Sequence, residues 1–170
     1  LDAHPGNANA AIALRAAYLA RGDAASAVEL MLREIEGAQG NLAKARLYAE
    51  MALLHRDRTK DTDKALEAAK KAVDLDPTSL VGLTVTGDIA FEAGHYVEAS
   101  KALDSVVSRV DALPEADRTR ILVRYIDALA KSGSTEKAIG AVDTLLRLAP
   151  DDGEARIKAA RVLLDAGKAS

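Results

Sequence analysis

The sequence contains no cysteine and no tryptophan, and it has only one phenylalanine and four tyrosines among its 170 residues. The lack of cysteine excludes disulfides, thiolate nucleophiles and zinc sites built on thiolates. No apolar run approaches the length of about 18 residues that a membrane-spanning helix needs. These absences leave the compartment open, because a targeting segment could lie outside this stretch of sequence.

A strong charge of either sign is also missing. The chain has 23 basic and 26 acidic residues, which gives a formal net charge of −3. Nucleic-acid binding rests on basic surfaces and on rings that stack with bases, so this composition does not indicate it. Hydrophobic residues, many of them alanine, make up 49% of the chain, which suits thin layers of closely packed helices.

Motifs for catalysis are absent as well. The sequence has no phosphate-binding glycine loop, no Gly-x-Ser-x-Gly and no His-Glu-x-x-His. His4, His55 and His95 lie in three separate segments, and none has a second histidine three or four residues away. We therefore expect no catalytic residue, no cofactor and no metal site, and we assign the histidines structural or surface roles.

A short pattern of a turn followed by a helix recurs along the chain. After Gly94, the residues Ala99, Leu103 and Val106 fall on one helical face. A glycine precedes an alanine by five residues at three places: Gly22 and Ala27, Gly94 and Ala99, Gly133 and Ala138. Such repetition predicts a chain built from similar helical units.

The period of the pattern can be measured on the same residues. Ala99 follows Ala65 by 34 residues, and Gly167 follows Gly133 by 34. The other two intervals between the alanines are longer by four and five residues, which we assign to insertions in turns. A proline stands twelve residues after Ala65 and again twelve after Ala138. A fixed period of about 34 residues is typical of helix-turn-helix repeats.

From Pro5 to its end the chain resembles the tetratricopeptide repeat family, whose repeat has this length and a comparable order of bulky, small and alanine positions. The resemblance implies an all-α fold, a right-handed α-solenoid of helix pairs that binds a protein partner in a concave groove. We expect four pairs and a terminal helix, within residues 1–170: repeats at 8–39, 42–77, 80–111 and 119–150 and a half-repeat at 152–166. A turn to another helix would follow Gly167, so we interpret the chain as a piece of a longer repeat protein.

The repeat pattern also predicts which residues are buried. We expect Ala27, Ala65, Ala99 and Ala138 at buried helix crossings. In the last helix we expect Ala159, Ala160 and Leu163 to face the core and Arg156 to face solvent. Arg15 and Glu34 stand where the family has small residues, and we expect both to extend outward with their charges in water.

The exposed face of the first helix of each pair should line the groove. It is apolar near the N-terminus, at Ile12, Ala13 and Ala16, and becomes cationic toward the C-terminus. The polar residues that we expect there are Arg46, Glu50, Thr84, Asp88, Arg120, Arg124, Asp127, Lys158 and Arg161. Arg120 and Arg124 lie one turn apart, and a guanidinium group suits a carboxylate.

These observations favour a non-catalytic scaffold for protein–protein interaction, with an acidic part of the bound segment near Arg120, Arg124 and Lys158. Some family members bind a peptide's C-terminal carboxylate with such a basic pair and two asparagines, but Ala16 and Glu50 stand at the asparagine positions here. The charges could instead be ordinary solvated groups. Two other hypotheses stay open: self-assembly through the apolar N-terminal end, and recruitment of substrate for a larger enzyme or a secretion or envelope protein.

Overall fold

The computed structural model describes residues 5–168, with side chains from residue 9 to residue 167. In this range the protein consists of nine α-helices joined by short turns, and it contains no strand. His4 lies outside the described residues. None of the described helices is long and apolar enough to cross a membrane. The chain divides into two compact units, Leu1–Ile89 and Ala90–Ser170, which we describe one at a time.

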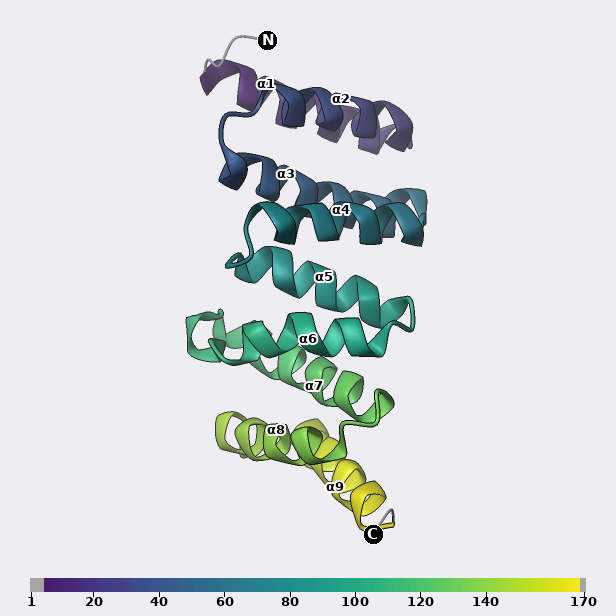
Figure 1. Ribbon diagram of the computed structural model, residues 1–170. Coiled ribbons are helices and arrows are strands. Elements are labelled where there is room, and N and C mark those ends of the chain that lie inside the picture. The colour runs from purple at the N-terminus through teal and green to yellow at the C-terminus, as the bar shows by residue number, and fades with distance from the viewer. Residues whose placement is uncertain (1–4, 169–170) are drawn as a thin grey trace. The chain divides into compact units, whose positions relative to one another are not determined.

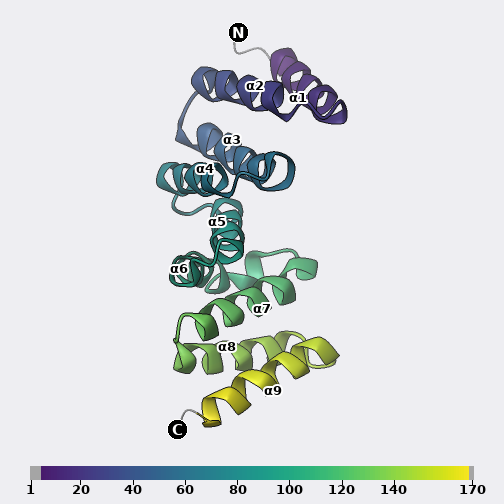
Figure 2. The ribbon, with the colours of Figure 1, turned by 90° about the vertical axis from the view of Figure 1, so that its right-hand side faces the viewer.

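The first unit contains four complete helices and most of a fifth. They are α1 (Pro5–Ala20), α2 (Ala24–Gly37), α3 (Asn41–Leu54), α4 (Thr62–Leu75) and α5 (Leu80–Glu92), of which α5 crosses the boundary between the units. Helix α1 packs against α2, α2 against α3, and α3 against α4 (Figures 1 and 2). The predicted helix pairs of this unit are therefore present.

Local chemistry explains where α2 and α4 begin. Gly22 has a φ of 75°, which a residue without Cβ adopts at little cost. Asp23 then caps α2, since its carboxylate accepts a hydrogen bond of 3.0 Å from the Ser26 amide. Asp61 caps α4 in the same way. Ala27 and Ala65 follow these caps and are completely buried, as predicted.

The connection between α3 and α4, residues 55–61, contains no glycine. Helix α3 continues into a π-helical turn, His55–Thr59, and Lys60 then adopts a φ of 56°, a conformation that glycine provides in other turns. The Thr59 hydroxyl donates to the His55 carbonyl oxygen, so its Oγ1 accepts from the His55 ring nitrogen Nδ1, 3.0 Å away. The His55 side chain is thereby buried at the end of helix α3.

We expect this histidine to make the protein less stable as the pH falls. Burial lowers the pKa of His55 from its ordinary value of 6.5, although Asp61 and Glu67 oppose the shift and Lys64 adds to it. The unfolded chain then binds the proton more readily, so the free energy of unfolding is highest above pH 6.5 and decreases below it. Urea denaturation from neutral pH to pH 5 should show this loss. His55→Gln should lose this part of the pH dependence, whereas His95→Gln, at an exposed site, should keep it.

The second unit contains the end of α5 and four further helices. These are α6 (Tyr96–Val107), α7 (Glu115–Lys131), α8 (Thr135–Leu148) and α9 (Gly153–Lys168), with a 3-10 turn at Val110–Ala112. Gly94 and Gly133 take positive φ angles at the turns before α6 and α8. Ala99 and Ala138 follow them and are completely buried, again as predicted. The repeat bounds given above remain a prediction.

A comparison of α7 with α9 shows how a following helix changes the exposure of side chains at equivalent positions. Leu122, Ile126 and Leu129 on α7 are at most 3% exposed, because α6 and α8 both pack against this helix. Thirty-four residues later, Ala160 is exposed and Leu163 is 47% exposed, so the prediction that both face the core was wrong. Among the described residues no helix follows α9, and its buried side instead carries Ala155, Ala159 and Val162.

Arg15 and Glu34 also differ from the prediction. Their side chains are only 12% and 15% exposed, and Arg15 Nε lies 3.3 Å from Glu34 Oε1. Arg15 Nη1 lies 2.9 Å from Glu50 Oε2 on α3, so one guanidinium connects α1, α2 and α3. The Arg15 and Glu34 side chains can turn inward because their opposite charges compensate each other and so lower the free-energy cost of burial. Burial raises the pKa of Glu34, Arg15 partly offsets this effect, and Glu50 adds to it.

Candidate functional site

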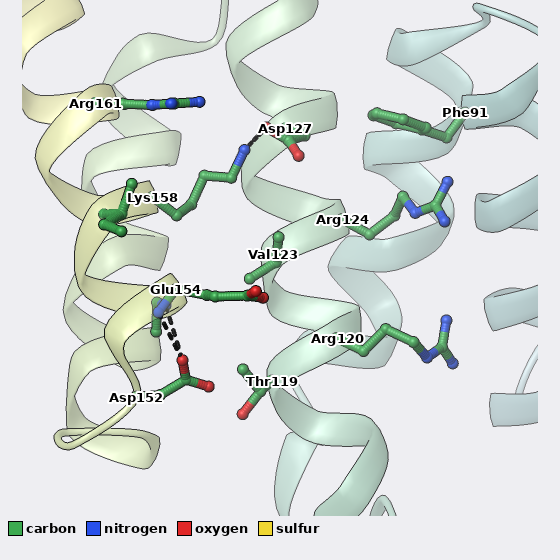
Figure 3. Close-up of a pocket in the computed structure, with 12 residues that line it drawn as sticks. Phe91, Thr119, Arg120, Val123, Arg124, Asp127, Asp152, Glu154, Lys158 and Arg161 are labelled. Atoms are coloured by element: carbon green, nitrogen blue, oxygen red, sulfur yellow. Dashed lines mark hydrogen bonds and ion pairs between the residues drawn. The ribbon is translucent and has the colours of Figure 1, made fainter.

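A pocket of about 720 Å³ lies in the second unit between α7 and α9 (Figure 3). Thr119, Arg120, Val123, Arg124 and Asp127 line it from α7, because residues three and four apart share a helical face. Phe91, from the end of α5, completes one wall. The remaining lining residues come from α9 and the turn before it: Asp152, Glu154, Ala155, Ile157, Lys158 and Arg161. We call this site the α7–α9 pocket.

The pocket carries charges of both signs. Its lining includes four cationic side chains and three carboxylates, an excess of one positive charge. Lys158 reaches across from α9 and forms an ion pair with Asp127 (Figure 3). Arg120 Nη2 lies 3.3 Å from Asp117 Oδ1. Arg161 is exposed and, within residues 9–167, forms no ion pair, so it is the most available cation of the four.

Two cationic side chains lie over the Phe91 ring and fix its position in the wall of the pocket. The Arg124 guanidinium carbon lies 4.8 Å from the centre of the Phe91 ring, and Lys131 Nζ lies 4.8 Å from the same centre. Tyr96 meets Phe91 edge to face, with 5.3 Å between ring centres. Each cation–ring contact contributes about 0.5–1 kcal/mol at a partly exposed site. Helix phase alone did not place Phe91 in the pocket. Two features of the sequence distinguish this residue: it is the only phenylalanine, and it stands three residues before the turn residue Gly94.

Five of the nine predicted groove residues line this pocket: Arg120, Arg124, Asp127, Lys158 and Arg161. The other four belong to the first unit. Glu50 lines a separate pocket of about 300 Å³ with Ile12, Ala16, Leu19 and Leu53, and it pairs with Arg15 there. Arg46 is exposed on α3, and Thr84 is half-buried on α5.

The prediction that Asp88 lines the groove is wrong. It is only 8% exposed, so it does not face an open groove. The reason is the packing of α5, whose residues from Val85 to Ala90 are all buried. Thr86 illustrates how closely this helix packs, since its hydroxyl donates to the Ala69 carbonyl oxygen on α4. The position of Asp88 along the helix predicted that its side chain would be exposed. The part of α5 around Asp88, however, is buried on all sides.

The described part of the chain has no group of three or more histidine or carboxylate side chains that could hold a metal ion. Tyr125, whose pKa burial raises strongly, donates to Asp104 and serves the packing of α6 against α7. What the α7–α9 pocket offers chemically is hydrogen bonding and charge, with apolar contact from Val123 and Ile157.

No protein-family model and no curated protein matches this sequence. Its fold nevertheless occurs in solved structures. MamA from Desulfovibrio magneticus RS-1 is similar, with a TM-score of 0.73, 18% identity and coverage of 94% of this chain and 85% of that one. A tetratricopeptide repeat protein from Parabacteroides merdae gives a TM-score of 0.76 at 16% identity, over 94% of this chain and 60% of that one.

A third similar structure is the first tetratricopeptide domain of Spaghetti (RPAP3) bound to the HSP90 peptide SRMEEVD. Its TM-score is 0.61 at 20% identity, over 74% of this chain and 95% of that one. At such identities a likeness establishes the fold. The chain thus has the all-α fold of tetratricopeptide repeat proteins, with helices packed in sequential pairs, and this confirms the resemblance found in the sequence.

Proposed function

We propose that this chain is a non-catalytic protein-interaction module, and that its α7–α9 pocket binds an extended segment of a partner protein that carries acidic side chains. The observation that carries the proposal is the gathering of four cationic side chains from two neighbouring helices around one pocket. The RPAP3 domain, which has the same fold, was solved with a peptide that contains two glutamates and an aspartate.

The chemistry of the lining indicates how such a segment is held. Arg120 and Arg161 each offer a planar fork to a carboxylate, and a charge-assisted hydrogen bond contributes about 1.5–3 kcal/mol. Val123 and Ile157 offer apolar contact between the charges. Glu154 repels an acidic residue placed over it, so it helps to select the register of the segment. Since the site is open to water, we expect binding to weaken as salt is added.

The first test measures binding of a fluorescent SRMEEVD peptide by anisotropy. The Arg120→Ala/Arg124→Ala double variant should bind at least about tenfold more weakly than the wild type, which corresponds to about 1.4 kcal/mol. Because Arg124 also stacks on Phe91, circular dichroism must show that the variant keeps its helices. Equal affinities of the wild type and a folded double variant would remove the site.

A second pair of variants leaves the contact between Arg124 and Phe91 intact. Arg161→Glu reverses a charge that faces the pocket, and Arg147→Glu reverses the charge of an exposed arginine on α8, outside the lining. Only the first should weaken binding. A peptide with glutamine in place of both glutamates keeps its aspartate and its terminal carboxylate, so Arg161→Glu should weaken its binding less. If both variants lose affinity equally, general attraction between charges explains the binding and the pocket does not.

A further inference from the structure

An ion pair crosses the α7–α9 pocket from one helix to the other. Lys158 of α9 extends toward α7 and pairs with Asp127, which lies 31 residues earlier in the chain (Figure 3). Both side chains line the pocket and are partly shielded from water, with exposed fractions of 22% for Lys158 and 30% for Asp127. A carboxylate of this protein therefore already occupies the lysine that an acidic partner would meet.

The apolar side of α9, rather than this ion pair, holds the helix in place. Helix α9 packs against α8, and Ala155, Ala159 and Val162 are at most 8% exposed. Burial of apolar surface is the main favourable contribution to such packing. A partly exposed ion pair adds little to it, because water hydrates both charges when the pair opens. The pair can therefore open while both helices stay in position.

Two further charged side chains of α9 lie beside Lys158 on the same helical face. Arg161 follows it by three residues and Glu154 precedes it by four, and both line the pocket. Both are exposed and, within residues 9–167, neither forms an ion pair. Arg161 is thus ready to accept an approaching carboxylate, whereas Lys158 is already paired. A segment bound at Arg161 brings its other acidic groups close to Lys158.

We propose that Asp127 is an internal competitor of the acidic segment, and that a carboxylate of the segment replaces Asp127 on Lys158 when the segment binds. This inference rests on the proposed function and names the contact that regulates its site. Lysine suits such an exchange, because its ammonium group offers three donors at the end of a flexible stem. Since the segment must first displace Asp127, it gains less than the full free energy of its new ion pair. Asp127 therefore lowers the affinity of the pocket for acidic segments.

Asp127→Asn tests the competition, because asparagine has nearly the same shape as aspartate and no charge. This variant should bind the fluorescent SRMEEVD peptide at least about fivefold more tightly than the wild type, the upper range for a partly exposed ion pair. Glu154→Gln removes a charge from the same lining without releasing a cation, so its gain should stay below about twofold. Equal gains in the two variants, or no gain in Asp127→Asn, would overturn the proposal.

The gain should also depend on Lys158. In the Asp127→Asn background, Lys158→Met should weaken binding of the peptide at least about fivefold, because it removes the cation that the first change released. The control is Lys137→Met, which removes an exposed charge on α8 outside the pocket lining and should weaken binding less than about twofold. Equal losses would mean that Lys158 acts only through general attraction between charges, and they would exclude the exchange.

A zero-length crosslink follows the exchange in the wild type itself. A carbodiimide joins a lysine amine to a carboxylate that touches it and takes up the water that is lost, so the free protein should yield an amide between Asp127 and Lys158. With the peptide at saturation, mass spectrometry should find Lys158 joined to a carboxylate of the peptide instead.

The outcomes separate this inference from the proposed function. If the wild type binds the peptide and still forms the link between Asp127 and Lys158 in full, the competition is wrong and the peptide site remains. If neither the wild type nor Asp127→Asn binds the peptide, both proposals fail. Binding by Asp127→Asn alone would support both, since it would show a pocket that its own carboxylate keeps closed.

Discussion

Replacing Leu129 with alanine should destabilise the second unit by about 2–5 kcal/mol, whereas the same replacement at Leu163 should cost less than about 0.5–1 kcal/mol. The two leucines are 34 residues apart, which is the predicted length of one repeat. Leu129 is 3% exposed on a helix that packs against α6 and α8, so its loss leaves a cavity in a packed layer, while Leu163 is 47% exposed. Burial alone therefore separates the two variants.

Urea denaturation followed by far-UV circular dichroism measures both effects. It should be done at a low protein concentration, so that association between molecules does not add to the stability of the wild type. Repeat proteins can unfold in steps, so the variants should be compared on the transition that belongs to the second unit. Equal losses of stability at Leu129 and Leu163 would mean that α8 does not cover α7 as described.

Arg15→Met should destabilise the first unit by about 2–4 kcal/mol at neutral pH, because it leaves the Glu34 carboxylate inside the protein without its nearest cation. The methionine keeps most of the volume of the arginine stem, so the loss is mainly electrostatic. The double variant Arg15→Met/Glu34→Leu should recover most of this stability, since apolar residues of similar size often replace buried ion pairs without loss. A double variant that stays as unstable as the single one would assign the effect to packing.

The pH dependence offers an independent check of this ion pair. Burial raises the pKa of Glu34 above 4.5, so the folded protein binds this proton more tightly than the unfolded chain does. Protonation therefore adds stability as the pH falls through the raised pKa, and the gain is complete below 4.5. Without Arg15 the pKa of Glu34 should rise further, so Arg15→Met should recover stability at a higher pH than the wild type. Denaturation midpoints measured across this range would show the difference.

The repeat period predicted the helices, their pairing and the buried alanines, because these depend on local properties. A glycine at a positive φ angle ends one helix at Gly94 and at Gly133, whatever packs nearby. Ala99 and Ala138 then stand at the same distance along the next helix, on the side that faces its partner. The same phase argument identified five side chains that line the α7–α9 pocket, because residues on one face of α7 stay together wherever that helix lies.

Tertiary structure decided the features that depend on which element covers a residue. Leu129 and Leu163 have the same phase, but α8 covers only the first. Asp88 has the phase of a groove residue and is buried with the rest of its helix segment, while Arg15 turns inward because Glu34 meets it there. Phe91 joins the pocket from another helix and is held by Arg124 and Lys131. Helix periodicity, a property of one segment, determined the elements and their faces, whereas burial and charge pairing are properties of two or more segments and required the three-dimensional arrangement.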